Sequence, residues 1–250
     1  MRNIILVFII SFFIYSCDKQ EPSINKIEMP ATNGNQIIEH LAYTLSYNET
    51  HEQADWVAYY LTKEEAVSDS FSRKDDFRED PEVSTGSSAL SDYKDTGYDR
   101  GHLCPAADNH WSKDAMSESF YMSNMSPQNQ SFNRGKWSYL EKEVRHWAEI
   151  YDGVYVVVGG VLKDDLPTIG DNKVSIPNYF YKVILDYNGK KAIGFIMPNI
   201  PIEDSFKNYS VSVDSVESFT GLDFFINLPD DEEENIESNF NISQWDFKYY

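Results

Sequence analysis

Two stretches in the first quarter of the chain have the pattern of paired β-strands. Residues 43–47 alternate between apolar and polar positions, and residues 56–61 are rich in aromatic and apolar side chains. Alternation with a period of two is typical of a strand with one buried face. The polar segment 48–55 separates the two stretches, so they are predicted to form a β-hairpin. Residues 64–97 are charged and rich in Gly and Ser, which indicates a long loop of the kind that is usually functional or disordered.

Three more apolar runs predict strands in the second half of the chain. Residues 154–158 are continuously apolar and end in Gly159-Gly160, a pattern typical of a buried strand. Residues 180–185 and 192–197 flank a segment that contains Asn188-Gly189. Asn-Gly is a strong hairpin signal, so these two runs are predicted to pair.

A helix is predicted over residues 135–151, because five apolar side chains recur there at spacings of 3, 4, 3 and 4. They are Trp137, Leu140, Val144, Trp147 and Tyr151. A second helix is expected over residues 211–219, where Gly221 would end it. Strands and helices do not alternate regularly, so we expect an α+β fold with an antiparallel β-sheet core flanked by helices.

The N-terminus has the features of a bacterial export signal. Arg2 precedes an apolar stretch over residues 4–14, which is too short to span a bilayer comfortably. Tyr15-Ser16-Cys17 resembles the end of a lipobox, so we expect a signal peptide over residues 1–17 and lipidation of Cys17; a buried N-terminal helix is the alternative. The protein is then an exported bacterial lipoprotein, anchored to a membrane by its lipid and facing the periplasm or the cell surface. Residues 18–40 predict a flexible tether and residues 41–250 a single domain.

Composition limits the classes of site. Of 250 residues, 41% are hydrophobic, enough for one sizeable core. With Cys17 lipidated, Cys104 is the one remaining thiol, so an internal disulfide and a Cys-rich zinc site are both excluded, and packing is its expected role. The net charge of −20 opposes long-range attraction to nucleic acid. A hydrolase needs positive potential only around the phosphate, however, and the acidic run 230–234 predicts a solvated face or loop.

The segment Asp99-Arg100-Gly101-His102 carries candidate chemistry. An imidazole titrates near neutral pH and can take a proton from water. Gly101 would permit a tight turn or a positive φ that presents His102 outward, and Arg100 could hold a phosphate with two hydrogen bonds. The alternative is a turn with a hydrogen-bonded surface histidine, and these four residues alone do not decide between the two.

Two polar residues near the predicted helix are further candidates. Asn133 lies where the helix would begin, as an N-cap or as an oxygen ligand for a hard cation such as Mg²⁺, which keeps several waters and needs few protein ligands. Glu141 lies beside the apolar stripe, where a carboxylate needs a partner. It would form a helix pair with Arg145 or hold a metal-bound water.

Several separated motifs in the same order resemble the DNA/RNA non-specific endonuclease family. The similarity covers most of residues 42–230 and includes the spacing as well as the residue types. The matching segments are Trp56-Val57-Ala58-Tyr59, Arg73-x-x-x-Phe77-x-x-Asp80, Asp99-Arg100-Gly101-His102, Asn124-x-x-Pro127-Gln128, Asn133-x-Gly135-x-Trp137, Leu140-Glu141 and Thr220-Gly221-Leu222-Asp223-Phe224-Phe225.

The resemblance implies a ββα-metal active-site motif and assigns roles by position. His102 would be the general base and Asn133 the direct ligand of Mg²⁺, with Mn²⁺ or another divalent cation as alternatives. Glu141 would contact the metal through water, Arg73 and Arg100 would bind phosphate and stabilise developing charge, and Arg134 would contact substrate. The remaining histidines match no motif and are expected to be structural or on the surface: His40, His51, His110 and His146.

The expected activity is metal-dependent hydrolysis of phosphodiester bonds in DNA and RNA to 5′-phosphate products. Two other functions remain open from the sequence. One is a surface lipoprotein that binds nucleic acid or another partner without cleaving it. The other is a phosphodiesterase that acts on small or lipid phosphodiesters. Oligomeric state is not indicated by the sequence.

Overall fold

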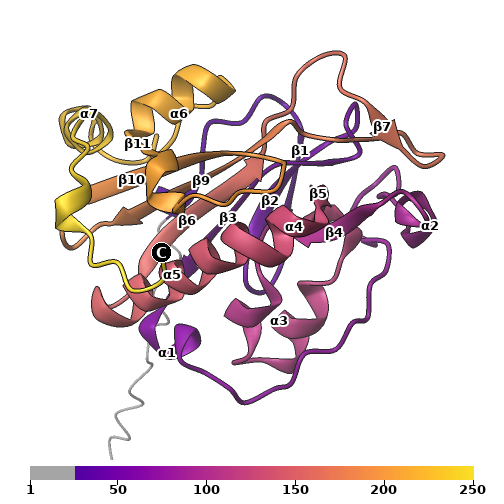
Figure 1. The fold of residues 1–250 in the computed structure, drawn as a ribbon, viewed down its shortest axis with the longest axis horizontal. Helices are drawn as coiled ribbons and strands as arrows, with labels where there is room; N and C mark the ends of the chain where they lie inside the picture. Colours follow the sequence, from indigo (N-terminus) through magenta and orange to yellow (C-terminus); the bar gives the residue numbers. More distant parts are fainter. Residues whose placement is uncertain (1–25) are drawn as a thin grey trace, which may run out of the picture.

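The fold is centred on a seven-stranded sheet in the order β1-β2-β3-β6-β9-β10-β11, in which every neighbouring pair is antiparallel (Figure 1). The computed structural model describes residues 26–250, so the predicted signal peptide and Cys17 lie outside the described residues. The sheet strands are β1 (Gln36–Glu39), β2 (Thr44–Asn48), β3 (Gln53–Leu61), β6 (Val154–Gly160), β9 (Tyr179–Asp186), β10 (Lys191–Pro198) and β11 (Ser210–Val211). Both predicted hairpins are present, as β2–β3 and β9–β10.

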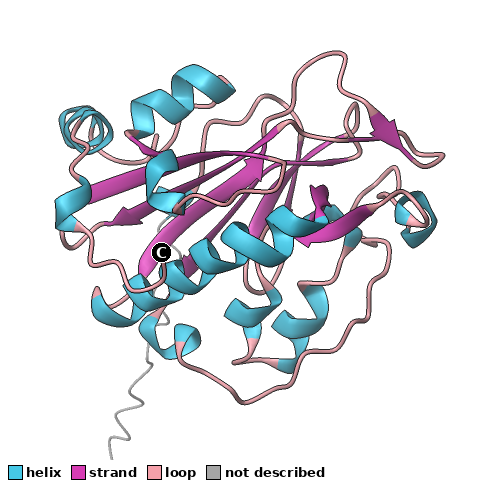
Figure 2. Ribbon diagram, viewed as in Figure 1, coloured by secondary structure: helices cyan, strands magenta, loops and turns pink. Residues whose placement is uncertain are grey.

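Both faces of this sheet are buried, which explains the continuous apolar runs in its strands. In β6, Val156 and Val158 belong to one core and Val157 to the other, and the same alternation holds along β9 and β10. The first core lies under α5 (Ser138–Ile150), which buries the predicted stripe from Leu140 to Trp147. The second lies under α6 (Val213–Thr220) and α7 (Asp230–Ser238). The helices therefore cover opposite faces of one sheet (Figure 2), and the expected α+β architecture is confirmed.

A separate antiparallel pair of strands, outside the main sheet, carries the His102 motif. Its strands are β4 (Tyr98–His102) and β5 (Met125–Asn129), with His102 opposite Met125. After β5 the chain enters α4 (Gln130–Phe132), a π-turn over Asn133–Trp137, and then α5. Two strands followed by a helix form the predicted ββα arrangement.

Shorter elements complete the described chain. The loop predicted over residues 64–97 is irregular apart from two single turns of helix at its ends. The short helices are α1 (Lys63–Ala66), α2 (Leu90–Tyr93), α3 (Lys113–Glu118) and 3₁₀ turns at Lys26–Glu28, Ala106–Asn109, Met122–Asn124, Phe206–Tyr209 and Ile242–Gln244; β7 (Thr168–Ile169) pairs with β8 (Val174–Ser175). Within residues 26–250, no helix has the length and apolar character needed to cross a membrane.

One expectation about the chain ends needs correction. The predicted tether over residues 18–40 is wrong for its described part, because β1 is the edge strand of the sheet and Ile27, Met29 and Ile38 are buried in the two cores. Its weak periodicity reflects a short edge strand rather than a linker. The acidic run 230–234, expected as a solvated face or loop, is the first part of α7, where Asp230, Asp231 and Glu234 are exposed and Glu232 and Glu233 are half-buried. Negative side chains are favoured there by the helix dipole.

Candidate active site

His102 ends β4 with its ring against two aromatic side chains. The ring centroid lies 4.9 Å from that of Phe120, edge to face, and 5.7 Å from that of Phe77. The residue is 9% exposed, and among residues 26–250 neither ring nitrogen has a hydrogen-bond partner; Nε2 is fully buried. The hydrogen-bonded surface histidine is therefore not what the structure contains. An imidazole held by packing alone keeps its lone pair free for a proton.

Gly101 allows this packing through close approach, not through a positive φ as the sequence suggested. A Cβ on Gly101 would lie 2.2 Å from the side chain of Gln128 on the paired strand. Gln128 is fully buried. A larger residue at position 101 would therefore force the buried side chain of Gln128 to move.

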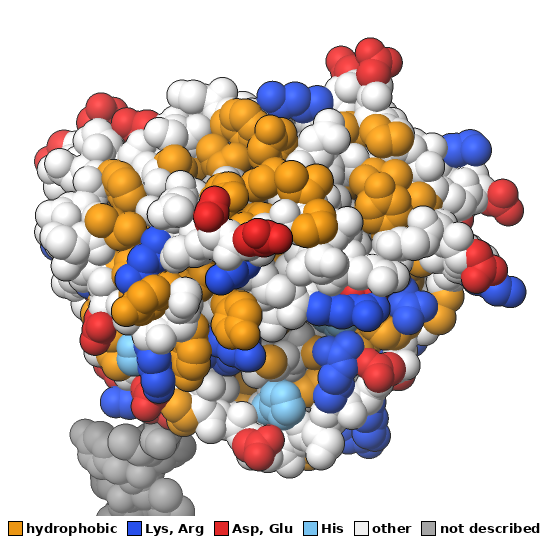
Figure 3. Space-filling view, viewed as in Figure 1, with side chains coloured by type: hydrophobic (Ala, Val, Ile, Leu, Met, Phe, Trp, Pro, Cys, Tyr) orange, Lys and Arg blue, Asp and Glu red, His pale blue; other side chains and the backbone are white. Residues whose placement is uncertain are grey.

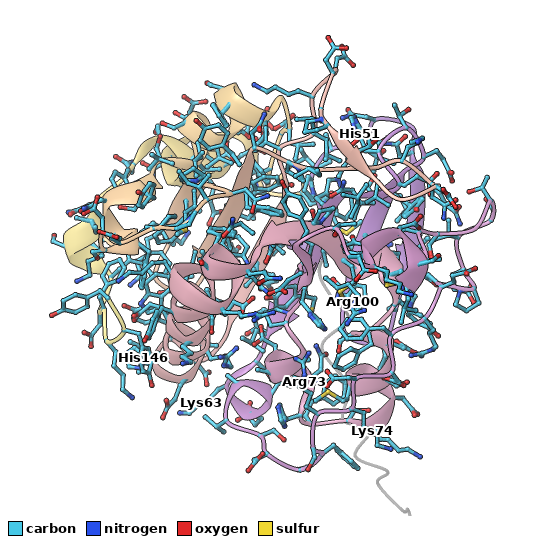
Figure 4. The ribbon with its side chains drawn as sticks, turned by 45° about the vertical axis from the view of Figure 1, so that its right-hand side comes forward. His51, Lys63, Arg73, Lys74, Arg100 and His146 are labelled. Carbon is cyan, nitrogen blue, oxygen red and sulfur yellow. The ribbon has the colours of Figure 1, made fainter. Side chains whose placement is uncertain are left out.

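Two guanidinium groups gather around the histidine ring. The Cζ of Arg100 lies 4.2 Å from the centroid of Phe77, and the Cζ of Arg73 lies 4.9 Å from that of Phe120. Each of the two aromatic rings thus carries a cation and contacts His102. Figure 4 places Arg73 and Arg100 on the same side of the molecule, with Lys74 nearby. The two arginines, 27 positions apart in sequence, form one basic site with the histidine.

This environment holds His102 in the neutral form. Burial and, to a smaller extent, the positive charges of Arg73 and Arg100 together lower the pKa of His102 to about 3. A neutral imidazole accepts protons, as a general base must. Because protonation is favoured more in the unfolded chain than in the fold, acid pH works against the native state at this residue.

Replacement of Arg100 by methionine should raise the pKa of His102, because one of two repelling charges is lost. An NMR titration of the imidazole in the metal-free protein measures this directly. The wild type should show no midpoint near 6.5, and Arg100→Met should move the midpoint upward. Arg134→Met is the matched control and should leave it unchanged. A wild-type midpoint at or above 6.5 would contradict the role of burial and of the arginines.

Asn133 lies in the π-turn between α4 and α5, not at a helix N-cap. The cap of α4 is Asn129, whose side chain accepts hydrogen bonds from the backbone N–H groups of Ser131 and Phe132. The turn is kinked at Gly135, which has φ −103° and ψ −119°. π-turns inside helices occur frequently at functional sites. The N-cap interpretation of Asn133 is therefore wrong. Because its side-chain amide does not cap a helix, it can bind a ligand.

Asp99 orients that amide. Nδ2 of Asn133 donates to Oδ2 of Asp99 at 2.9 Å. No described residue donates to Oδ1 of Asn133, so the oxygen is available. Asp99 also accepts two hydrogen bonds from Arg134, at 2.8 Å and 2.7 Å, so this arginine is engaged in an exposed ion pair. The sequence assigned no role to Asp99 beyond its place in the motif, because its partners follow it by more than 30 positions.

Glu141 lies on the first turn of α5 above a group of buried charges. The pKa of Glu141 is raised to about 7, because the effect of burial outweighs the lowering by Lys182, Arg145 and Arg73; Asp108 adds a smaller rise. The expected helix pair with Arg145 is not the main contact of that arginine, which donates to Asp108 at 2.6 Å. Lys182 on β9 is fully buried, and its Nζ has no hydrogen bond and lies 4.7 Å from the Trp137 ring. Lys182 could not be recognised from the sequence, because it is a single polar position in an apolar strand.

The residues form two connected groups. His102, Arg73 and Arg100 share the Phe77–Phe120 cluster, and Asn133 and Arg134 share Asp99, three residues before His102 on β4. Arg73 links the first group to Glu141, since its charge acts on both His102 and Glu141. The donor set fits a hard divalent cation: one oriented amide oxygen to which no described residue donates, and one half-buried carboxylate whose raised pKa a nearby cation would lower.

The charge of the surface around this site differs in sign from the net charge of the chain. Although the chain has a net charge of −20, Lys and Arg side chains gather on the face that carries α4 and β4 (Figure 3). The acidic first part of α7 lies in a different part of the fold (Figure 1). Local positive potential is therefore present where a phosphate would bind, as the sequence argument required.

Comparisons with known proteins agree on one family. A sequence model of the family described as DNA/RNA non-specific endonuclease matches residues 20–231. The chain is similar to the nuclease C1 of Cunninghamella echinulata var. echinulata, with 38% identity over 212 residues that cover 76% of this chain and 83% of the relative. It is also similar to the mitochondrial endonuclease G of Homo sapiens, with 35% identity over 203 residues that cover 75% and 68%. The mitochondrial nuclease EXOG of Danio rerio is 36% identical over 201 residues, which cover 73% of this chain and 59% of that protein.

The fold has a solved counterpart of similar sequence. A crystal structure of the EndoG/EndoGI complex contains a chain with a TM-score of 0.74 and 34% identity, and the match covers 82% of this chain and 91% of that one. The likeness therefore extends over the sheet and the ββα arrangement, not over one motif.

Proposed function

Because the chain belongs to the DNA/RNA non-specific endonuclease family, we propose that it cleaves DNA and RNA with His102 as the general base and a divalent cation held by Asn133. One observation carries the proposal. The neutral imidazole of His102 has no hydrogen-bond partner among the described residues, and Arg73 and Arg100 pack on the two rings that it contacts. Asp99, on the same strand as His102, accepts a hydrogen bond from the amide of Asn133.

The proposed chemistry follows from these side chains. His102 takes the proton of a water molecule aimed at phosphorus. Arg73 and Arg100 bind the phosphate and stabilise the negative charge that grows in the transition state. A divalent cation held at this site would supply further positive charge to stabilise the leaving group. Asn133 would hold that cation directly and Glu141 through water, with Mg²⁺ as the proposed ion; the products would carry 5′-phosphate and 3′-hydroxyl ends.

Low sequence specificity follows from the same contacts. Arginine side chains bind the phosphate backbone, which carries no base information. Neither the 2′-hydroxyl nor a base acts as the nucleophile, so both DNA and RNA are proposed substrates. Arg134 is proposed as a secondary substrate contact, since its exposed guanidinium borders the site while it pairs with Asp99.

We also propose that the protein is an exported lipoprotein attached through Cys17, with residues 26–250 in one nuclease domain. Support for the anchor comes from the sequence of residues 1–17. Mass spectrometry of the membrane-bound protein tests it: the expected N-terminal peptide begins at a diacylated Cys17, and a Cys17→Ala variant should be released from the membrane fraction.

Nicking of supercoiled plasmid tests the activity. The purified domain 18–250 should convert supercoiled plasmid to open circles with Mg²⁺ and degrade a structured RNA, and EDTA should abolish both. Binding of plasmid without nicking across a panel of divalent metals would indicate a non-catalytic lipoprotein. Hydrolysis of a small chromogenic diester without plasmid cleavage would indicate a phosphodiesterase. Either of these results would overturn the proposal.

A further inference from the structure

A cluster of carboxylates lies between α6 and α7, on the other side of the sheet from α5. The two helices pack against each other and against β10 (Figure 1). Asp214 and Glu217 come from α6 and Glu237 from the last turn of α7. One side-chain oxygen from each of these three residues lies within 4.8 Å of those of the other two.

Burial of Glu237 is what distinguishes this cluster from an ordinary acidic surface. Glu237 is 6% exposed, and its Oε1 is buried without a hydrogen-bond partner. Oε1 of Glu233, one turn earlier on α7, is also buried and unpartnered. An unpaired carboxylate in such a place is strongly disfavoured. The last turn of a helix adds to this, because its dipole is negative there.

In the described part of the chain, no positive side chain pairs with these carboxylates. Over residues 26–250, Asp214, Glu217, Glu233 and Glu237 form no ion pair with Lys, Arg or His. Burial and the neighbouring carboxylates, Glu217 first, raise the pKa of Glu237 to about 9. One proton on Glu237 would neutralise it but would leave Asp214 and Glu217 facing each other. A divalent cation would bind all three carboxylates and offset most of their negative charge.

The geometry of the remaining oxygens suits such an ion. Oε1 of Glu217 accepts a hydrogen bond from the backbone N–H of Phe224 at 2.8 Å, which fixes the carboxylate and leaves its second oxygen free. Asp214 and Glu217 are half-buried, so water can complete the coordination. Ca²⁺ takes six to eight oxygen ligands in flexible geometry, whereas Mg²⁺ demands a near-ideal octahedron.

We propose that Asp214, Glu217 and Glu237 form a Ca²⁺ site that joins α7 to α6 and stabilises the C-terminal part of the fold. Glu233 lies close enough to add negative potential. This site is separate from the candidate active site, since it lies over the second core and Asn133 and Glu141 lie beside the first. The proposal does not depend on the nuclease activity.

Calcium titration of an Asn133→Ala protein tests the site, because that variant removes the proposed catalytic ligand. After EDTA treatment and dialysis, isothermal titration with CaCl₂ should show one bound Ca²⁺ per chain, and Ca²⁺ should raise the Tm more than Mg²⁺ does. Glu237→Gln should weaken Ca²⁺ binding by at least about tenfold, the scale on which even outer-sphere partners affect metal affinity. Glu149→Gln, an exposed glutamate on α5, is the matched control and should bind Ca²⁺ normally.

The metal-free Tm gives a second readout. Glu237→Gln should not lower it, because the amide adds no negative charge beside Asp214 and Glu217, while the Ca²⁺-dependent rise disappears. Absence of Ca²⁺ binding to the Asn133→Ala protein, or an equal Ca²⁺ response in Glu237→Gln, would overturn the proposal.

Discussion

Replacement of His102 by alanine is expected to lower kcat by at least about 100-fold, the usual scale for loss of a general base. The fold should persist, because neither ring nitrogen makes a hydrogen bond to a described residue and no partner is left unsatisfied. Initial rates of plasmid nicking at saturating Mg²⁺, together with thermal unfolding of the same preparation, measure both effects.

His110→Ala is the matched control for this variant. The His110 side chain is 22% exposed, and its ion contact is with Asp69 at 3.6 Å, outside every motif. Its kcat should stay within about twofold of the wild type, as for most surface changes. A fall of less than tenfold for His102→Ala would refute the role of His102.

Replacement of Asn133 by alanine is expected to raise the Mg²⁺ concentration for half-maximal activity by at least about tenfold, since even outer-sphere partners alter metal affinity about 10–100-fold. The physical reason is loss of the amide oxygen that Asp99 orients. Mg²⁺ titrations of activity at fixed substrate measure the effect.

Asn129→Ala separates a lost ligand from a disturbed helix. Asn129 caps α4 four residues before Asn133, so its loss should lower stability by about 1 kcal/mol. Its Mg²⁺ titration curve should stay unchanged. If Asn133→Ala also gave an unchanged curve, Asn133 would not be the metal ligand.

The main sheet could be predicted from the sequence because its signals are local. The Asn-Gly turn between two apolar runs depends on neighbouring residues only, and so does the helical stripe with spacings of 3 and 4. The predicted β9–β10 hairpin and helix α5 are both present. The strands β4 and β5 could not be predicted in this way. They contain Gly101 and Pro127 and many polar side chains, and they pair across more than 20 residues.

The candidate site also has a part that could be predicted from the sequence and a part that could not. Family motifs pointed to His102, Asn133 and Glu141, and the family is confirmed by the relatives. The roles of these residues stay predictions. What surrounds them depends on contacts between distant segments, such as Asp99 with Asn133 or Arg145 with Asp108, 37 positions apart. Lys182 in β9 could not be predicted for the same reason, because its charged neighbours come from distant parts of the chain.

Anomalous diffraction from crystals soaked in Mn²⁺ tests the central claim most directly, because it locates the cation independently of activity. The account predicts a peak within bonding distance of Oδ1 of Asn133, with Glu141 no further than one water away and the His102 imidazole facing the same space. A protein that cleaves DNA with Mn²⁺ but whose ordered Mn²⁺ lies elsewhere, with none at Asn133, would contradict it.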